Sequence, residues 1–510
     1  MHALRFFFSV GLISLFLTGC SQSPVSTMSP SSSSTSSSST NSAQVSLSIT
    51  DEPPTGVTVL FFQISLTSAN LTPASGSSSI SLLSNNTPIQ VDVTQLQAIS
   101  AFLSTANVPA ETYNSLSLTF ANPQLVIFNA SDQAIASTCP VNATCQLTPK
   151  IDNSSTLTFS AAPFPVTVAQ NTPLGFLLDF HLDQVIQSDL SVDLSATNGV
   201  TVAQLPSAPP MGPSPFGFLL GTVESVNSGQ NEFTLQTRFG RTFTIDVNSG
   251  TSYQNFPSTV CTTSNLSCVA TGQIVKVQVA SVESDGNLLA AQVSYIQTAA
   301  QEVVEGNIIG LSASNGTTVM NLLLHWSPDS VQFPFGGIAS VTIAAGATFS
   351  VDSGNFTIPK GLSFASTSDL LVGQEVQVSV AAGSLSNSRA LAFWAPPSLS
   401  FTTSSVELEP SQVTGTVTSV NASGSSFTIT TFPNFFSPWL NSTWPNWRAT
   451  LITVQATSQT AYQDFSPDSF SGVSNNNVVS VQGWLFSTPS GATPTTLLAD
   501  TVLGRPERFF

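Results

Sequence analysis

Basic side chains are scarce in this sequence. It has ten Lys and Arg residues among 510, against 27 Asp and Glu, and its formal net charge is −17. Proteins that bind nucleic acids neutralise phosphate groups with Lys and Arg, and anionic lipid surfaces attract the same residues. We therefore expect no nucleic-acid partner, and charge alone cannot hold this chain to a membrane.

Charge of either sign is rare, and long apolar runs are missing. Charged residues make up 7% of the chain, whereas about 25% is usual for soluble domains. Ser, Thr, Asn and Gln must therefore supply most of the polar surface. The hydrophobic fraction of 41% is ordinary, so cores can form. No segment has the roughly 20 apolar residues that a membrane-spanning helix requires.

Motifs of known enzyme classes are also missing. The chain has three histidines, and neither His181 nor His325 lies near a nucleophile-elbow pattern. A phosphate loop, a dinucleotide fingerprint and a His-Glu-x-x-His motif are absent. We therefore predict a protein that is not an enzyme, with no catalytic residues and no cofactor. The acidic residues would suffice for a paired-carboxylate site, so an unrecognised carboxylate-dependent hydrolase stays an alternative.

The first twenty residues have the form of a secretory signal. A short basic start ending at Arg5 precedes an apolar run from Phe6 to Leu17 and the tetrapeptide Leu17-Thr18-Gly19-Cys20. The tetrapeptide resembles the lipobox of bacterial lipoproteins, which implies cleavage before Cys20 and a lipid on that cysteine. We expect a cell-envelope protein held to a membrane by its N-terminal lipid. Ser21 after the cysteine implies the outer membrane. The alternative is an ordinary cleaved signal in which Cys20 is incidental.

Five cysteines are consistent with export. Once Cys20 is assigned to the lipid, two close pairs remain, Cys139 with Cys145 and Cys261 with Cys268. An even set of cysteines in an exported protein is typical of disulfides. Metal binding is the alternative, but no His lies near either pair and neither is a Cys-x-x-Cys motif. We therefore predict two disulfides and no metal site.

Composition and periodicity divide the chain into domains. The predicted ranges are a signal peptide at 1–20, a disordered Ser/Thr-rich tether at 21–43, a β-sandwich at 44–203, a Pro-rich linker at 204–216, and β-barrel repeats at 217–300, 301–398 and 411–504. Alternation of apolar and polar residues with period two indicates half-buried strands. A capping box formed by Thr94 and Gln97 predicts one short helix, with Leu96, Ile99 and Leu103 on one face.

The predicted fold class is therefore all-β. An N-terminal antiparallel β-sandwich with one short helix is followed by three small five-stranded β-barrel-like repeats. The sandwich resembles the bacterial family catalogued as domain of unknown function 4382 over roughly residues 44–203. The resemblance rests on Ser48-Ile49-Thr50-Asp51-Glu52-Pro53-Pro54, on Val91-Asp92-Val93-Thr94-Gln95-Leu96 and on Leu177-Leu178-Asp179-Phe180. It implies location and fold rather than a mechanism.

The rest of the chain is an internal repeat. Gly221-Thr222-Val223-Glu224-Ser225-Val226-Asn227 returns as Gly415-Thr416-Val417-Thr418-Ser419-Val420-Asn421, and a weaker middle copy starts at Gly306. About five short strands in each copy favour a small closed barrel, which has no exposed sheet edge. The copies resemble the family catalogued as domain of unknown function 5666, the second being divergent.

Two loops of the repeats are rich in aromatic residues. The third copy has an insertion between Phe427 and Tyr462, and the second has a long loop with His325, Phe333 and Phe335. Aromatic side chains on loops often bind ligands, and Trp faces suit sugar rings. The candidate ligand-binding residues are Trp326, Phe435, Phe436, Trp439, Trp444 and Trp447. The alternative is that these rings pack within or between the barrels.

Asp179, His181 and Asp183 alternate on a predicted strand, so their side chains would share one face. Such a set could hold a metal, but no fourth ligand is identifiable, and a polar face without metal is favoured. We expect a lipid-anchored cell-envelope protein that acts as a non-enzymatic binding or structural module. Its partner would be a polysaccharide or an envelope protein. A glycan-binding lipoprotein that uses the aromatic loops is the alternative.

Overall fold

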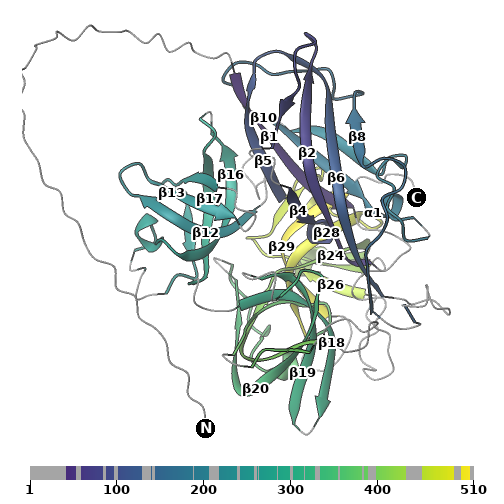
Figure 1. The fold of residues 1–510 in the computed structure, drawn as a ribbon. Coiled ribbons are helices and arrows are strands. Elements are labelled where there is room, and N and C mark those ends of the chain that lie inside the picture. The colour runs from purple at the N-terminus through teal and green to yellow at the C-terminus, as the bar shows by residue number, and fades with distance from the viewer. Residues whose placement is uncertain are drawn as a thin grey trace, which may run out of the picture. The chain divides into compact units, whose positions relative to one another are not determined.

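The computed structural model describes one compact unit within 41–510. The described residues are 42–52, 59–83, 88–96, 101–128, 139–140, 144–187, 189–205, 218–237, 242–257, 261, 263–283, 285–298, 303–314, 316–327, 333–353, 356–381, 384–388, 398–431, 451–487 and 495–505. Their regular structure is almost entirely β, as predicted (Figure 1). The signal peptide and almost all of the tether lie outside this range. None of the helices in the described part has the length and apolar character needed to cross a bilayer.

Two sheets form the N-terminal sandwich. The first has the order β11 (Val200–Leu205), β10 (Leu174–His181), β1 (Ser42–Glu52), β5 (Ala101–Pro109). The second contains β2 (Val59–Pro73), β3 (Ile80–Ser81), β4 (Ile89–Asp92), β6 (Thr112–Phe128), β7 (Thr144–Leu147), β8 (Thr156–Phe159) and β9 (Val166–Thr167). One pairing, β1 with β10, is parallel. A single helical turn, α1 (Leu182–Val185), follows β10.

The helix predicted from the capping box is wrong where the structure describes it. The chain forms the 3₁₀ turn η2 (Val93–Leu96), residues 97–100 lie outside the described ranges, and Leu103, expected on the helix, lies in β5, which pairs antiparallel with β1. The Oδ1 atom of Asp92 accepts hydrogen bonds from the backbone N–H and the hydroxyl of Thr94. This turn follows β4 directly. The hydrogen bonds that β1 offers to β5 outweigh the local helical signal, because tertiary pairing overrides propensity.

Three closed barrels follow the sandwich, and each is a ring of five strands, as predicted, with a sixth short strand (β15, β22 or β27) paired to the last strand of the ring. Their closing strands pair in parallel as β14 with β17, β20 with β23 and β26 with β29. The first barrel has β12 (Phe218–Asn227), β13 (Glu232–Thr237), β14 (Thr242–Asp246), β15 (Ser252–Gln254), β16 (Gln273–Val282) and β17 (Leu288–Thr298), with the turn η3 (Leu266–Cys268). The second has β18 (Val303–Ser314), β19 (Thr317–Trp326), β20 (Ile338–Val351), β21 (Glu375–Ser379), β22 (Ser386–Ser388) and β23 (Ser398–Glu409), with η4 (Thr367–Asp369).

The third barrel has the same strand order as the first barrel. It contains β24 (Ser411–Asn421), β25 (Ser426–Thr431), β26 (Leu451–Gln455), β27 (Ala461–Gln463), β28 (Val478–Phe486) and β29 (Thr495–Arg505), with η5 (Ala422–Gly424) and η6 (Phe470–Gly472). The second barrel runs beyond its predicted end at 398. Its last strand, β23, begins there and closes the barrel by pairing with β20 and β21.

One glycine in the first strand of each barrel shows that the three copies are equivalent. A Cβ added at Gly221, Gly306 or Gly415 would lie 2.4, 2.1 or 2.4 Å from a backbone oxygen of the next strand. Each first strand also has a register shift two residues after this glycine. Only glycine allows the two backbones to approach so closely. The middle copy, weak in sequence, therefore has the same strand geometry as the other two.

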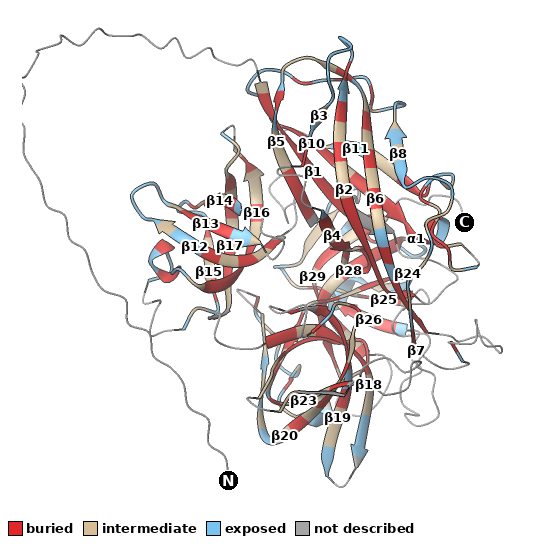
Figure 2. Cartoon of the chain, in the orientation of Figure 1, coloured by how far each residue is buried: buried red, intermediate tan, exposed pale blue. Residues whose placement is uncertain are grey.

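The domains share apolar clusters. Phe102 of β5 belongs to the cluster of the first barrel. Leu60 and Phe61 of β2 belong to the cluster of the third barrel, and Trp484 of β28 belongs to that of the second. Figure 2 shows buried residues on strands of every domain. This packing brings residues that are distant in sequence around one cavity.

Candidate functional site

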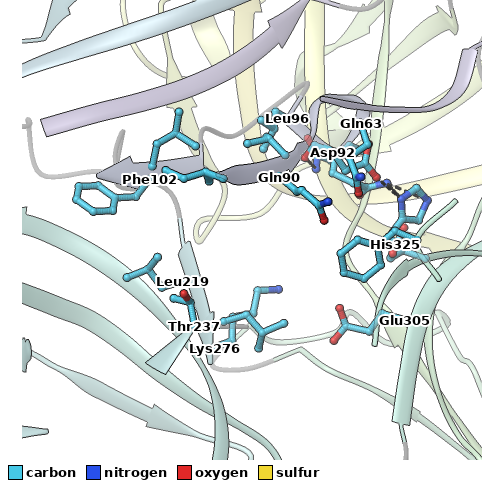
Figure 3. A pocket seen from close by; sticks show the side chains of 18 of the residues that line it. Gln63, Gln90, Asp92, Leu96, Phe102, Leu219, Thr237, Lys276, Glu305 and His325 are labelled. Atoms are coloured by element: carbon cyan, nitrogen blue, oxygen red, sulfur yellow. Dashed lines mark hydrogen bonds and ion pairs between the residues drawn. The ribbon is translucent and has the colours of Figure 1, made fainter. Parts of the chain in front are cut away.

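A cavity of about 260 Å³ lies where the sandwich meets the barrels (Figure 3). We call it the interdomain cavity. Its lining is Gln63, Ile89, Gln90, Val91, Asp92, Gln95, Leu96, Phe102 and Leu103 of the sandwich, Leu219, Leu220, Thr237, Phe243 and Lys276 of the first barrel, Glu305, His325, Phe335, Glu375 and Glu409 of the second, and Pro410, Gln412 and Gln482. Ligand pockets are usually somewhat larger, roughly 300–1,000 Å³. The cavity therefore suits a small ligand.

The two sides of the interdomain cavity differ in polarity. In Figure 3, Phe102 and Leu219 lie on one side, while Asp92 and His325 lie on the other. This concentration of charge is unusual for a chain in which charged residues are so rare. The cavity is thus amphipathic, with an apolar half and a charged half.

A buried ion pair joins the sandwich to the second barrel at this cavity. The Oδ2 atom of Asp92 lies 2.5 Å from Nδ1 of His325, and their side chains are 11% and 5% exposed. Burial alone would lower the pKa of His325, but the negative charges of Asp92 and Glu375 raise it above its usual value. The carboxylates around the imidazole therefore favour its charged form.

Gln95 of η2 connects the same ion pair to its surroundings. Its Nε2 atom lies 3.1 Å from Nε2 of His325 and donates to Oδ1 of Asn307 at 3.3 Å. Its backbone oxygen accepts a hydrogen bond from Nε2 of Gln412 in the third barrel. One short turn of the sandwich thus contacts both barrels.

Two glutamates of the second barrel face each other across neighbouring strands. Glu375 of β21 and Glu409 of β23 are paired directly in the antiparallel register, and both are buried. Side chains in such positions lie on the same face, with Cβ atoms about 5 Å apart, and like charges there repel. Burial raises the pKa of Glu375 to about 7, although the charge of His325 opposes this. Burial also raises the pKa of Glu409 well above its usual range.

Glu305 and Lys276 reach the cavity from two different barrels. Figure 3 shows their side chains extending toward the same region of the cavity. Burial raises the pKa of Glu305, although the Lys276 ammonium opposes the shift. Burial lowers the pKa of Lys276, but Glu409 and Glu305 more than offset this, and the net shift is upward. Lys276 therefore stays charged.

One buried acceptor at the cavity lacks a donor. Gln63 of β2, opposite Asp92 in the strand register, is 3% exposed, and its Oε1 atom has no hydrogen-bond partner among the described residues. Buried polar groups are nearly always hydrogen-bonded in folded proteins. The site therefore offers an acceptor to a ligand that carries hydrogen-bond donors.

Some of the sequence-predicted site residues can now be placed. The four cysteines form the predicted disulfides, Cys139–Cys145 and Cys261–Cys268. Cys20 and the loop residues Phe435, Phe436, Trp439, Trp444 and Trp447 lie outside the described residues, as does the side chain of Trp326. The aromatic-loop hypothesis for the third barrel therefore stays a prediction.

One aromatic residue of the long loop of the second barrel packs in the core, and the residues at its ends line the interdomain cavity. Phe333 is fully buried and lies edge-to-face with Phe401, with ring centroids 5.9 Å apart. Phe335 and His325, at the two ends of the segment, line the interdomain cavity. The aromatic content of this loop thus indicated a site. The residues that line the cavity, Phe335 and His325, differ from Trp326, the residue of this loop that was predicted to bind a ligand.

The predicted common face of Asp179, His181 and Asp183 is wrong. Asp179 and His181 lie on β10, with Oδ2 and Nε2 3.8 Å apart, but Asp183 lies in α1 and is exposed. The strand ends at His181, so alternation does not extend to the third residue. Across the described ranges, no group of three or more His, Cys, Asp or Glu side chains is arranged to hold a metal ion.

Sequence analysis did not find the charged half of the cavity. Its residues are scattered over three domains, so no local motif contains them. The sequence did contain one signal for these residues. Single charged residues interrupt apolar strand segments, as Lys276 does between Val275 and Val277 and as Glu305 does after Val304. In a chain with so few charges, a charge in a strand that is otherwise apolar indicates a buried functional or interdomain position.

Comparison with known families agrees with the division into domains. Residues 42–198 match the family described as Domain of unknown function (DUF4382), and residues 221–294 match the family described as Domain of unknown function (DUF5666). The first range covers the sandwich through α1, and the second covers most of the first barrel. No curated protein matches the chain. These matches confirm the resemblance predicted for the sandwich and the resemblance predicted for the first repeat; for the second and third repeats the resemblance stays a prediction.

Proposed function

We propose that this protein is a lipid-anchored cell-envelope protein that binds a small ligand in the interdomain cavity and catalyses no reaction. The observation that carries this proposal is the buried Oε1 atom of Gln63, which has no hydrogen-bond partner among the described residues, in a lining that also contains the buried glutamates Glu375 and Glu409. Leaving a buried polar group unsatisfied costs roughly 1–3 kcal/mol. A ligand that supplies donors would recover this free energy on binding.

The anchoring part of the proposal rests on the N-terminal sequence. Cys20 follows a signal-like segment and would carry the lipid, and the Ser/Thr-rich segment after it would separate the domains from the bilayer. Ser21 supports the outer membrane as the location. An acidic chain with few Lys and Arg residues gains little from the membrane surface itself, so the lipid would provide the attachment.

Filling the cavity tests the binding function. Gln90 is half-buried and points into the cavity in Figure 3, and Thr237 lines it from the first barrel. The variants Gln90→Trp and Thr237→Trp would each occupy the space. The control is Leu451→Trp, which places the same side chain at an exposed position of the third barrel. A library of small fragments would be screened by thermal shift and by NMR against all four proteins.

The proposal predicts fragments that bind the wild type and Leu451→Trp but bind neither filled variant. Circular dichroism would establish that the filled variants are folded. Because the two substitutions lie in different domains, the test can still be carried out if one variant does not fold. If no fragment distinguishes the wild type from the folded, filled variants, the cavity is not a binding site and the proposal is wrong.

A carboxylate-dependent hydrolase is the second candidate, and one observation favours it. The pKa of Glu375 is raised to about 7 by burial, and Asp92 lies in the same cavity, paired with His325. A protonated carboxyl near an ionised one can act as a general acid. Turnover of an aryl glycoside panel by the wild type, lost in Glu375→Gln but kept in the exposed control Glu224→Gln, would establish this function in place of binding alone.

A further inference from the structure

We infer that the ligand of the interdomain cavity is a small organic cation, with an ammonium group at the charged half of the cavity and an alkyl or aromatic body at the apolar half. This inference rests on the proposed binding function and names its ligand class. Three independent features of the cavity support it: its charge, its hydrogen-bonding groups and its apolar wall.

The first feature is the sign of the charge. Asp92 is already paired with His325, so the glutamates Glu305, Glu375 and Glu409 share Lys276 as the remaining cation among the charged residues that line the cavity. An opposite charge stabilises such carboxylates and a like charge destabilises them. A cationic ligand is therefore favoured over an anionic one.

The cross-strand position of two of these glutamates strengthens the argument. Glu375 and Glu409 lie directly opposite each other on neighbouring strands, and like charges in such positions are destabilising. An ammonium group near them would offset part of this unfavourable charge. A neutral ligand would leave these two like charges in place unless one of the carboxyl groups stayed protonated.

The second feature is a buried acceptor without a donor, the Oε1 atom of Gln63. The carboxyl groups of Glu375 and Glu409 add further acceptor oxygens to the lining, and all three residues are more than 90% buried. A primary ammonium group carries three N–H donors and no acceptor. One such group can therefore donate to several of these acceptors at once. An alcohol offers a single donor and can donate to only one of them.

The third feature is the apolar wall. Phe102, Leu103 and Phe243 face the cavity beside Leu96 and Leu219. A bare inorganic cation or a small diol would leave this wall without a partner. Burying apolar surface contributes roughly 25 cal/mol per Å², so an alkyl chain or a phenyl ring on the ligand adds affinity. The volume of about 260 Å³ limits the body to a group of that size.

Protons would be released when the cation binds. The charged groups around Glu375 are Asp92, Lys276, Glu305 and His325, with Glu409 opposite it in the strand register, and burial raises the pKa of Glu375 to about 7. A cation nearby lowers the pKa of a carboxyl group. Binding at neutral pH would therefore displace protons from Glu375 and its neighbours, and affinity would rise with pH between about 6 and 8.

Isothermal titration calorimetry on the full chain with three probes of one shape tests this inference. The probes are phenethylamine, 2-phenylethanol and phenylacetate, which differ in charge while sharing a phenyl body. We expect the amine to bind at least about tenfold more tightly than the alcohol and the acid to show no binding. The measured heat should depend on the ionisation enthalpy of the buffer, because protons are released.

Substitutions of residues that line the cavity test whether the amine binds there. Glu375→Gln should weaken amine binding by about tenfold and change alcohol binding little, and Glu224→Gln, an exposed residue of the first barrel, should change neither. If Glu375→Gln does not fold, Glu305→Gln carries the same expectation. Amine binding that survives both Gln90→Trp and the glutamate variants would place the amine elsewhere and overturn the inference.

The failure of this inference can be told apart from the failure of the proposed function. If the alcohol or the acid binds as tightly as the amine and is lost in Gln90→Trp, the cavity binds ligands but does not select cations. If none of the three probes binds while uncharged fragments distinguish the wild type from the filled variants, the cation inference is again wrong and the binding function stands.

Discussion

Oδ2 of Asp92, the last residue of β4, lies 2.5 Å from Nδ1 of His325 on β19. The two residues are far apart in sequence and belong to the sandwich and the second barrel. Their side chains are almost completely buried, and Oδ1 of the same carboxylate accepts two hydrogen bonds from Thr94. The contact between these domains therefore includes a desolvated ion pair in addition to apolar packing.

Removing one partner of this pair should destabilise the protein strongly. In Asp92→Asn, His325 would stay buried without its counter-charge, and breaking a buried pair in this way costs roughly 3 kcal/mol or more. Urea unfolding of the wild type and the variant measures the loss. The control is Asp183→Asn, which alters an exposed carboxylate in α1. Equal stability of the two variants would contradict the structural role of the pair.

Stability should fall as the pH rises from about 5 to 8. The pKa of Glu375 in the folded protein is about 7, above the ordinary value of 4.5. A folded-state pKa above the unfolded value means that the folded state binds the proton more tightly, so this contribution to stability is present at low pH and is lost as the pH passes through 7. A shift of this size corresponds to a loss on the order of 3 kcal/mol.

Thermal unfolding across this pH range checks the prediction. Glu375→Gln should flatten the decline, because the amide cannot ionise, whereas the exposed Glu224→Gln should follow the wild type. Identical pH profiles for the wild type and Glu375→Gln would show that this carboxyl does not control the decline.

The glycine at the first strand of each barrel should not tolerate a methyl group. In Gly306→Ala the new Cβ would lie 2.1 Å from the backbone oxygen of Leu323, so the strands must separate. Overpacking of this kind typically costs 1–3 kcal/mol, occasionally more. Gly229→Ala is the matched control, because its nearest atom would be 3.6 Å away, on the Asn227 side chain. Equal unfolding midpoints for the two variants would refute the close approach.

The sequence predicted the class of the fold because periodicity and repetition are local signals. Alternation identified strands, and the recurrence of the segments that begin at Gly221 and Gly415 identified the barrels. The helix expected after Thr94 was wrong because β1, which is distant in sequence, offers β5 a better set of hydrogen bonds. The end of the second barrel was misplaced for a similar reason, since β23 is defined by its pairing with β20.

The interdomain cavity was beyond local sequence analysis. Glu375 and Glu409 become neighbours only through the register of β21 and β23, and Lys276 joins them from another barrel. Each residue alone resembles an ordinary surface charge. Their common location depends on how the domains pack, which no short motif records.

Membrane attachment should depend on one cysteine. Cys20→Ala removes the only thiol that the lipobox-like segment provides, so the protein should move from the membrane fraction to the soluble envelope fraction. Ser21→Ala, which keeps the cysteine, is the control and should stay with the membrane. Fractionation followed by immunoblotting measures the distribution. If Cys20→Ala remains bound to the membrane, the attachment lies elsewhere in the chain.

A crystal structure of the full chain grown with saturating phenethylamine tests the central claim most directly. We expect density for the amine in the interdomain cavity, with its nitrogen within hydrogen-bond distance of Gln63 or of a glutamate of the second barrel, and its ring against Leu96 and Phe102. An unoccupied cavity, or an amine whose nitrogen points to the apolar wall, would contradict the claim.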